Sequence, residues 1–152
     1  NVQENEGEVK SISCKENITV VNIFSMRMLN SYGYLKKIFE IFDRHQTSVD
    51  LITTSEVNVS VTVDNDEFLN DIKLELSAFA KVNIEKDKSL VCVVGSNIRN
   101  SKGMPGKIFS VLSDYNITMI SLGSSLINIS FVVDKIKLDE ILQKLHNTFF
   151  KD

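Results

Sequence analysis

Few side chains in this sequence combine the types and the spacing that catalysis or metal binding requires. The histidines, His45 and His146, each lie near the end of a helical pattern. A histidine there more often interacts as a cation with the helix carboxyl end than acts as a base or a ligand. The cysteines, Cys14 and Cys92, do not cluster with histidine at metal-ligand spacing. The Gly103–Gly106 turn lacks the Gly-Lys-Ser or Gly-Lys-Thr of a phosphate loop. We therefore predict no catalytic residue and no metal site.

Two carboxylates and one glycine indicate a different chemistry, the binding of a small zwitterion. Asp50 and Glu56 lie in and just after a predicted strand, and Gly33 opens a predicted helix. The first turn of a helix offers unpaired N–H groups and a positive dipole, so an anion would bind at residues 33–35. Asp50 would then face an ammonium group, and a second ammonium would explain the second acid. The alternative is that both acids are solvated loop residues, and the pattern alone leaves both interpretations open.

The elements that would hold these residues occur twice. The sequence matches itself without a gap at a displacement of 70 residues, which aligns Lys37–Phe39 with a second copy of the same three residues. A gapless match of this length predicts a duplicated structural unit. Asp50 aligns with Ile120. Glu56 aligns with Leu126, so the first copy carries acids where the second copy is apolar.

Each copy predicts the order strand, helix, strand, strand, helix, and the first copy adds a last strand. Apolar residues from Leu35 to Phe42 recur at the i, i+3, i+4 and i+7 positions of one helix face. Alternating valines from Val57 to Val63 indicate a strand with one buried face. We predict strands at residues 18–24, 48–53, 57–63 and 80–85, and helices at residues 35–42 and 68–76. The order βαββαβ is that of the ferredoxin-like motif.

The second copy ends after its second helix pattern, at Leu138–Leu145, and lacks a sixth element. A spare strand pattern lies at the other end of the chain, at Val9–Cys14. We therefore predict an α+β protein of two ferredoxin-like units, with the first inserted in sequence into the second. Residues 1–8 would be a linker, residues 9–15 a strand that completes the second unit, residues 16–87 the first unit, and residues 88–152 the second. The alternative is that the N-terminal segment is a frayed tail.

The composition excludes several classes of protein. Hydrophobic residues make up 43% of the 152 residues, too many for a disordered chain. The net charge is −3, so we expect no nucleic-acid partner. No apolar run approaches the ~20 residues of a membrane span, and the first ten residues do not form a signal peptide. Two cysteines suit a reducing cytoplasm. Because the chain does not begin with Met, we expect a fragment of a longer protein.

Two segments of the first copy resemble a known family. Met28–Leu35 reads MLNSYGYL and Ser48–Val57 reads SVDLITTSEV, and both resemble aspartate kinases of the lysine-sensitive type. Ile120–Ser125 and Asn128–Phe131 in the second copy are similar to the same family. The resemblance extends from Val9 to Phe150 and covers only the regulatory half of such an enzyme. The kinase domain, with its ATP and magnesium, would lie outside this chain.

The resemblance implies a non-catalytic region of two tandem ACT domains that bind the end-product amino acid. It also implies a homodimer in which two first units join their sheets, with the effector at the interface. Backbone amides at residues 33–35 would hold the effector carboxylate, and Asp50 would face an ammonium group. Two residues depart from the family pattern, Asn30 where His is common and Tyr34 where Phe is usual. The effector-binding residues carried over by position are Met28, Ser31, Gly33, Tyr34, Leu35, Ser48, Val49, Asp50, Ser55 and Glu56.

Feedback regulation by lysine is therefore the function that we expect. Threonine ranks lower, because a neutral side chain would leave one acid without a partner. An RNA-recognition module shares the βαββαβ order but stacks bases on sheet aromatics, and Val57–Val63 contains no aromatic residue. A dimerisation module without a ligand is the remaining alternative.

Overall fold

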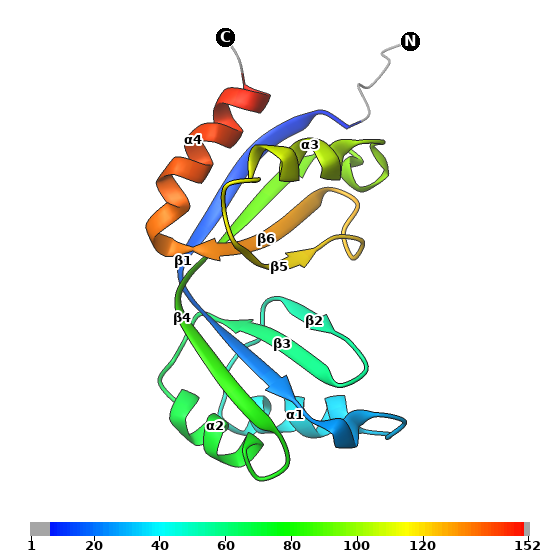
Figure 1. Ribbon diagram of the computed structural model, residues 1–152, viewed down its shortest axis with the longest axis vertical. Coiled ribbons are helices and arrows are strands. Elements are labelled where there is room, and N and C mark those ends of the chain that lie inside the picture. The colour runs from blue at the N-terminus through cyan, green and yellow to red at the C-terminus, as the bar shows by residue number, and fades with distance from the viewer. Residues whose placement is uncertain (1–6, 151–152) are drawn as a thin grey trace. The chain divides into compact units, whose positions relative to one another are not determined.

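The computed structural model describes residues 7–150, so most of the linker predicted at residues 1–8 lies outside the described residues. The chain divides into two compact units (Figure 1). The first unit comprises residues 17–87, and the second comprises residues 1–16 together with 88–152. The prediction of two ferredoxin-like units, one inserted into the sequence of the other, is confirmed. Among the described residues, no helix is long and apolar enough to cross a membrane.

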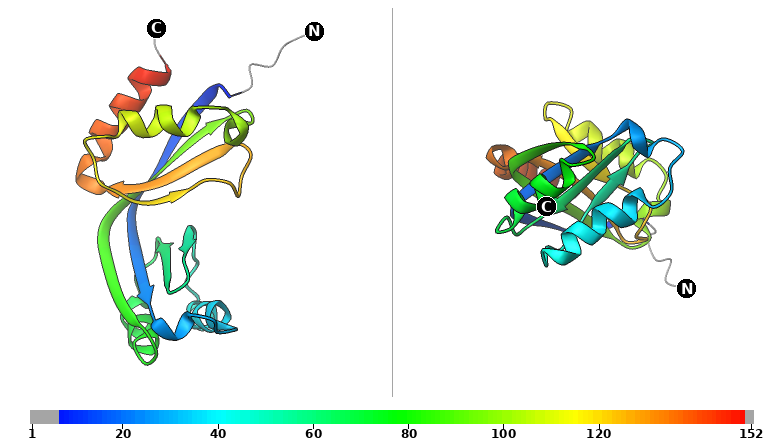
Figure 2. Two further views of the ribbon diagram at one scale, coloured as in Figure 1. Left: turned by 45° about the vertical axis from the view of Figure 1, so that its right-hand side comes forward. Right: turned by 90° about the horizontal axis from the view of Figure 1, so that it is seen from below.

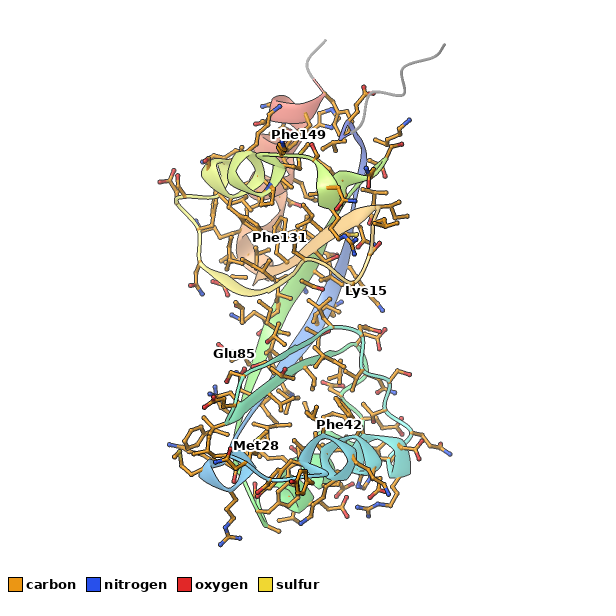
Figure 3. The ribbon with its side chains drawn as sticks, turned by 90° about the vertical axis from the view of Figure 1, so that its right-hand side faces the viewer. Lys15, Met28, Phe42, Glu85, Phe131 and Phe149 are labelled. Carbon is orange, nitrogen blue, oxygen red and sulfur yellow. The ribbon has the colours of Figure 1, made fainter. Side chains whose placement is uncertain are left out.

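The first unit is a four-stranded sheet with two α-helices on one side (Figures 1 and 3). Its strands lie in the order β2-β3-β1-β4, and β3 pairs antiparallel with both β1 and β2. In chain order its elements are the second half of β1 (Val9–Phe24), the 3-10 helix η1 (Met26–Met28), α1 (Tyr34–Arg44), β2 (Ile52–Thr54), β3 (Asn58–Val63), α2 (Leu69–Leu76) and the first half of β4 (Lys81–Gly95).

Apolar spacing determines which face each element of the first unit buries. Ile41 and Phe42 lie one turn after Ile38 on the same face of α1, and all three are buried. Alternate valines of β3, from Val59 to Val63, are fully buried against them. Figure 3 shows Phe42 between α1 and the strands. Each such side chain stabilises the fold by roughly 1.5–3 kcal/mol, so this layer fixes α1 and the loop that precedes it.

The second unit repeats this arrangement with strands from both ends of its sequence. Its strands lie in the order β1-β4-β6-β5, and β6 pairs antiparallel with β4 and β5. In chain order its elements are the first half of β1, the second half of β4, the 3-10 helix η2 (Ile98–Asn100), α3 (Met104–Val111), β5 (Ile117–Ser121), β6 (Asn128–Asp134), the 3-10 helix η3 (Lys135–Lys137) and α4 (Leu138–Phe149). Figure 3 labels Phe131, a fully buried residue of its core.

The N-terminal segment is built into the second unit. Val9 is buried in the same core cluster as Val91. The Gly7 N–H donates to the Ser96 carbonyl at 3.0 Å. Gly95 leaves no space for a side chain, because a Cβ there would lie 2.2 Å from the carbonyl oxygen of Glu8. This close backbone approach aligns the segment with β4 and covers a sheet edge that would otherwise be unpaired.

Two strands are longer than the sequence predicts. Residues 9–14 and 18–24 belong to one strand, β1, and residues 80–85 continue into the first strand of the second unit as β4 (Figure 2). Asn17 and Asp87 adopt left-handed backbone, at φ 57° and φ 58°, where the chain passes between units. Asn and Asp tolerate that conformation better than other side chains. The first boundary therefore falls after Glu16, one residue beyond the predicted one.

The strand predicted at residues 48–53 is shorter, because β2 contains only Ile52–Thr54. Thr62 on β3 meets two successive residues of this segment. Its carbonyl accepts from the Asp50 N–H at 3.0 Å, and its hydroxyl accepts from the Leu51 N–H at 2.9 Å. The pairing register of β2 with β3 is therefore displaced by two residues from the register that the gapless repeat implies. Ile52 pairs with Val61, whereas residue 120 pairs with Phe131 in the second unit.

Candidate functional site

The first unit contains a pocket of about 240 Å³ between the start of α1 and the β2–β3 turn. Ligand pockets in proteins more often measure ~300–1,000 Å³, so this pocket suits a molecule the size of an amino acid. Seven of the ten predicted site residues line it, and Thr54 lines it with them. The lining residues are Met28, Ser31, Gly33, Tyr34, Leu35, Thr54, Ser55 and Glu56.

The anion-binding side of the pocket is the amino end of α1. Gly33 precedes the helix in left-handed backbone, at φ 74°, and no side chain caps this end. A Cβ at Gly33 would meet nothing within 4 Å, so backbone conformation alone favours glycine there. The uncapped first turn directs its N–H groups outward with the positive end of the helix dipole. This end of the pocket can therefore accept a carboxylate.

Local hydrogen bonds shape the loop that leads to this helix end. The Met28 N–H donates to the Ser25 carbonyl at 3.1 Å, and the Ser31 N–H donates to the Met28 carbonyl at 3.1 Å. The Ser31 hydroxyl donates to the Arg27 carbonyl at 2.5 Å. Met28 itself is buried, at 8% exposure, and Figure 3 shows it on the 3-10 turn. The pocket wall at residues 28–31 is thus held by local bonds.

Glu56 provides the acidic side of the pocket. It lies in the tight connection between β2 and β3, where the Ser55 N–H donates to the Asn58 carbonyl at 2.9 Å. The Asn58 side-chain amide donates in turn to the Ser55 hydroxyl at 3.2 Å. Glu56 is exposed, so its carboxylate is free to meet a cation in the pocket. One pocket therefore offers amide donors and a carboxylate, as a zwitterion requires.

The other three predicted residues lie apart from this pocket. Ser48 and Val49 line a separate hollow of about 390 Å³ beside α1, together with Phe39 and Asp43. Asp50 is exposed and lines neither space. Asp50 lies apart from the pocket because β2 begins only at Ile52. The segment before Ile52 is bonded to Thr62 of β3 and does not follow the regular strand pairing. Within one chain, the structure therefore brings Glu56 to the helix end but not Asp50.

The second unit carries different groups at the equivalent position. The Arg99 guanidinium donates to the Gly123 carbonyl at 2.7 Å, and the Arg99 N–H donates to the Leu126 carbonyl at 3.2 Å. The Met104 N–H donates to the Ser101 carbonyl at 3.3 Å. Pro105, which aligns with Leu35, has no N–H to offer. The second unit therefore lacks both the acids and part of the amide donor set of the first.

Sequence reasoning missed one lining residue, Thr54. The signal that would have found it is its position, because it ends β2 directly before Ser55 and Glu56. In the part of the chain that the structure describes, no group of three or more His, Cys, Asp and Glu side chains is placed to hold a metal ion.

Comparison with known proteins agrees with this geometry. The family model for the ACT domain matches residues 21–70 and 91–149, one span in each copy of the repeat. The chain belongs to the ACT-domain family. Both units described above are accordingly ACT units, and the two matched spans reproduce the internal repeat that the sequence predicts.

Several similar proteins are aspartate kinases. The ACT chain is 36% identical to lysine-sensitive aspartokinase 3 of Escherichia coli K12 over 99% of its own length and 35% of that protein. It is 36% identical to chloroplastic aspartokinase 3 of Arabidopsis thaliana over 93% of its length and 27% of that protein. The chain thus spans about a third or less of these relatives. It matches only their regulatory part.

Solved structures give the same result for the fold. A C-terminal regulatory domain of aspartate kinase from Porphyromonas gingivalis W83 is 36% identical, covers 93% of this chain and 97% of that one, and superposes with a TM-score of 0.83. Escherichia coli aspartokinase III in complex with lysine and aspartate superposes with a TM-score of 0.87 over 99% of this chain and 35% of that one. The tandem ACT units are therefore an aspartate kinase regulatory region.

Proposed function

We propose that this chain binds lysine and conveys feedback inhibition to an aspartate kinase domain. The observation that carries the proposal is the uncapped amino end of α1 in one pocket with Glu56. The amides at residues 33–35 would hold the effector carboxylate. Support also comes from the similar Escherichia coli enzyme, whose structure was solved in complex with lysine and aspartate.

The side chain of the effector follows from the number of acids. Asp50 and Glu56 are both exposed in the first unit, and both have apolar equivalents in the second. An effector with two ammonium groups can pair with both acids, whereas threonine offers a single ammonium group. Lysine is therefore the preferred effector and threonine the alternative.

A second copy of the chain would complete the site. β2 is the outer strand of its sheet, and Ile52 on it is 45% exposed. Outer strands of this kind pair with other chains. Two first units joined through β2 would bring Ser48, Val49 and Asp50 of one copy toward the pocket of the other. The proposed dimer is tested by its mass in solution and should bury at least ~1,000 Å². A monomeric mass with and without lysine would contradict it.

The remaining expectations concern the protein as a whole. ATP and magnesium would be bound by an attached kinase domain, and this region would hold no cofactor of its own. We place the protein in the cytoplasm, which suits its two free thiols at Cys14 and Cys92.

Calorimetric titration of the 152-residue chain with lysine, threonine and S-adenosylmethionine tests the proposal. We expect one lysine per chain and at least tenfold weaker binding of threonine, since about 1.4 kcal/mol of lost charge pairing changes affinity tenfold. If threonine binds more tightly than lysine, threonine is the effector. If none of the three binds, the chain is a dimerisation module without a ligand.

A further inference from the structure

We infer that Ser25 is a positioning residue, which acts through the hydroxyl of Tyr34 to hold the amino end of α1 for the effector carboxylate. This inference rests on the proposed function. Ser25 does not line the pocket and was not among the predicted site residues. The contacts of the two side chains, and their replacement in the second unit, carry the argument.

Ser25 joins three parts of the first unit at the end of β1. It is buried, at 7% exposure. Its N–H donates to the Val57 carbonyl at 3.0 Å, which ties β1 to the residue after Glu56. Its hydroxyl accepts from the Arg27 N–H at 3.3 Å and so caps η1. The same hydroxyl lies 3.4 Å from the hydroxyl of Tyr34. Ser25 therefore contacts segments on both sides of the pocket.

Tyr34 is the first residue of α1, and its ring is fixed on a second side. The ring packs edge-on against Phe79, with the ring centroids 5.9 Å apart. The Lys37 ammonium lies 4.4 Å from the centroid of the Phe79 ring, one turn further along α1. The Tyr34 side chain is thus held by its hydroxyl contact with Ser25 as well as by its aromatic contact with Phe79. Together they set the direction in which the first-turn amides of α1 point.

The second unit lacks both members of this pair. Gly95 aligns with Ser25, and Met104 aligns with Tyr34. The backbone bond is retained, because the Gly95 N–H donates to the Ile127 carbonyl at 2.8 Å. The fold therefore needs the backbone contact at this position but not the two hydroxyls. The two hydroxyls occur in the unit whose helix end shares a pocket with Glu56.

The separation of 3.4 Å is long for an O–H···O hydrogen bond, which usually measures ~2.5–3.0 Å. Hydrogen bonds at active sites are often long in the free protein and tighten when the ligand binds. We expect the same of this contact when a carboxylate binds at the first turn of α1, because Tyr34 is the first residue of that helix. The contact would then contribute more in the bound protein than in the free one.

A double-mutant cycle on the 152-residue chain tests this role. Lysine affinity is measured by calorimetry for wild type, Tyr34→Phe, Ser25→Gly and the double variant. We expect each single change to weaken lysine binding about threefold to tenfold, which is the range of one net hydrogen bond. The double variant should bind lysine no more than about twofold less tightly than whichever single variant has the lower affinity. The reason is that the two changes remove one and the same contact. Tyr32→Phe is the matched control, since Tyr32 is fully exposed, and should bind as wild type does.

A purely structural role predicts a different pattern. It would lower the melting temperature of the ligand-free variants and leave the lysine affinity of the folded protein unchanged. Ser25→Thr keeps the hydroxyl and should retain most of the affinity. Unchanged affinity in Tyr34→Phe, or strictly additive losses in the double variant, would overturn the inference alone. A wild-type chain that binds no lysine would overturn the proposed function and this inference together.

Discussion

At the scale of single residues, the difference between the two ACT units lies in a few exchanges. Asp50 and Glu56 are acidic where Ile120 and Leu126 are apolar. The sequence alone identified these acids, because an internal repeat provides its own reference. It did not identify the geometry of Arg99, whose guanidinium donates a hydrogen bond to the Gly123 carbonyl. A long flexible side chain leaves no periodic signal from which its contacts can be predicted.

Asp50 should contribute strongly to lysine affinity. In the proposed dimer, where Asp50 of one copy faces the pocket of the other, we expect Asp50→Ala to weaken lysine binding at least thirtyfold, because removing one partner of a desolvated charge pair costs roughly 2–5 kcal/mol. Ile120→Ala is the matched control at the equivalent position and should leave lysine affinity nearly unchanged. Calorimetry measures both. Equal losses in the two variants, or no loss in Asp50→Ala, would mean that the acid does not recognise the effector.

At the scale of elements, the helices and strands followed from hydrophobic spacing, but the register of β2 did not. A displacement of two residues keeps every side chain on the same face, so the apolar pattern is equally satisfied by both registers. We attribute the choice to the hydroxyl of Thr62, which accepts from the Leu51 N–H, while Val132 at the equivalent position has no such group. A single hydroxyl is too local a signal for pattern analysis.

Thr62→Val tests this explanation of the register. Valine has the same shape and is the residue of the second unit, so the core should accept it. The Leu51 N–H would lose its acceptor, and we expect the free energy of unfolding to fall by about 1–2 kcal/mol, measured by urea denaturation. Thr53→Val on β2 is the control and should change it by no more than ~0.5 kcal/mol. An unchanged stability in Thr62→Val would show that the hydroxyl does not hold the segment.

The carboxyl end of α1 is tied to α2 through Glu75. The His45 ring nitrogen lies within hydrogen-bond distance of this carboxylate, and the Arg44 guanidinium donates to it at 2.7 Å. The bond from His45, followed by that from Arg44, lowers the pKa of Glu75 below its ordinary value of 4.5. A carboxyl whose pKa is lower in the folded protein stabilises the fold above the unfolded pKa. That stabilisation is lost as the pH falls through the folded pKa.

Glu75→Gln should therefore be more harmful at neutral pH than in acid. We expect a lower melting temperature than wild type at pH 7 and a smaller difference in acid, because the wild-type carboxyl also becomes neutral as the pH falls through its folded pKa. Glu40→Gln is the control, because Glu40 pairs only across an exposed helix face with Lys36. Differences from wild type that are equal at both pH values would show that the charge of Glu75 is not the stabilising feature.

At the scale of the whole molecule, the inserted arrangement was predictable because the second copy lacked one strand and the N-terminus carried a spare one. The continuity of β1 and β4 was not predictable. The polar residues around Asn17 and Asp87 resemble loop residues in sequence. Yet β1 and β4 each continue through one residue in left-handed backbone without ending. The pocket was predictable in part because seven of its residues lie in two short stretches of the sequence, at 28–35 and 55–56.

The most direct test of the central claim is a comparison of the two ACT units within one sample. Backbone amide spectra of the 152-residue chain, recorded by nuclear magnetic resonance, would be followed during titration with lysine. Gly33 and Gly103 hold equivalent positions before α1 and α3, and both adopt left-handed backbone. We predict that the Gly33 amide signal shifts to saturation while the Gly103 signal stays in place. Equal shifts at both glycines, or a stationary Gly33 signal in a protein that binds lysine, would contradict the claim that the first unit is the lysine sensor.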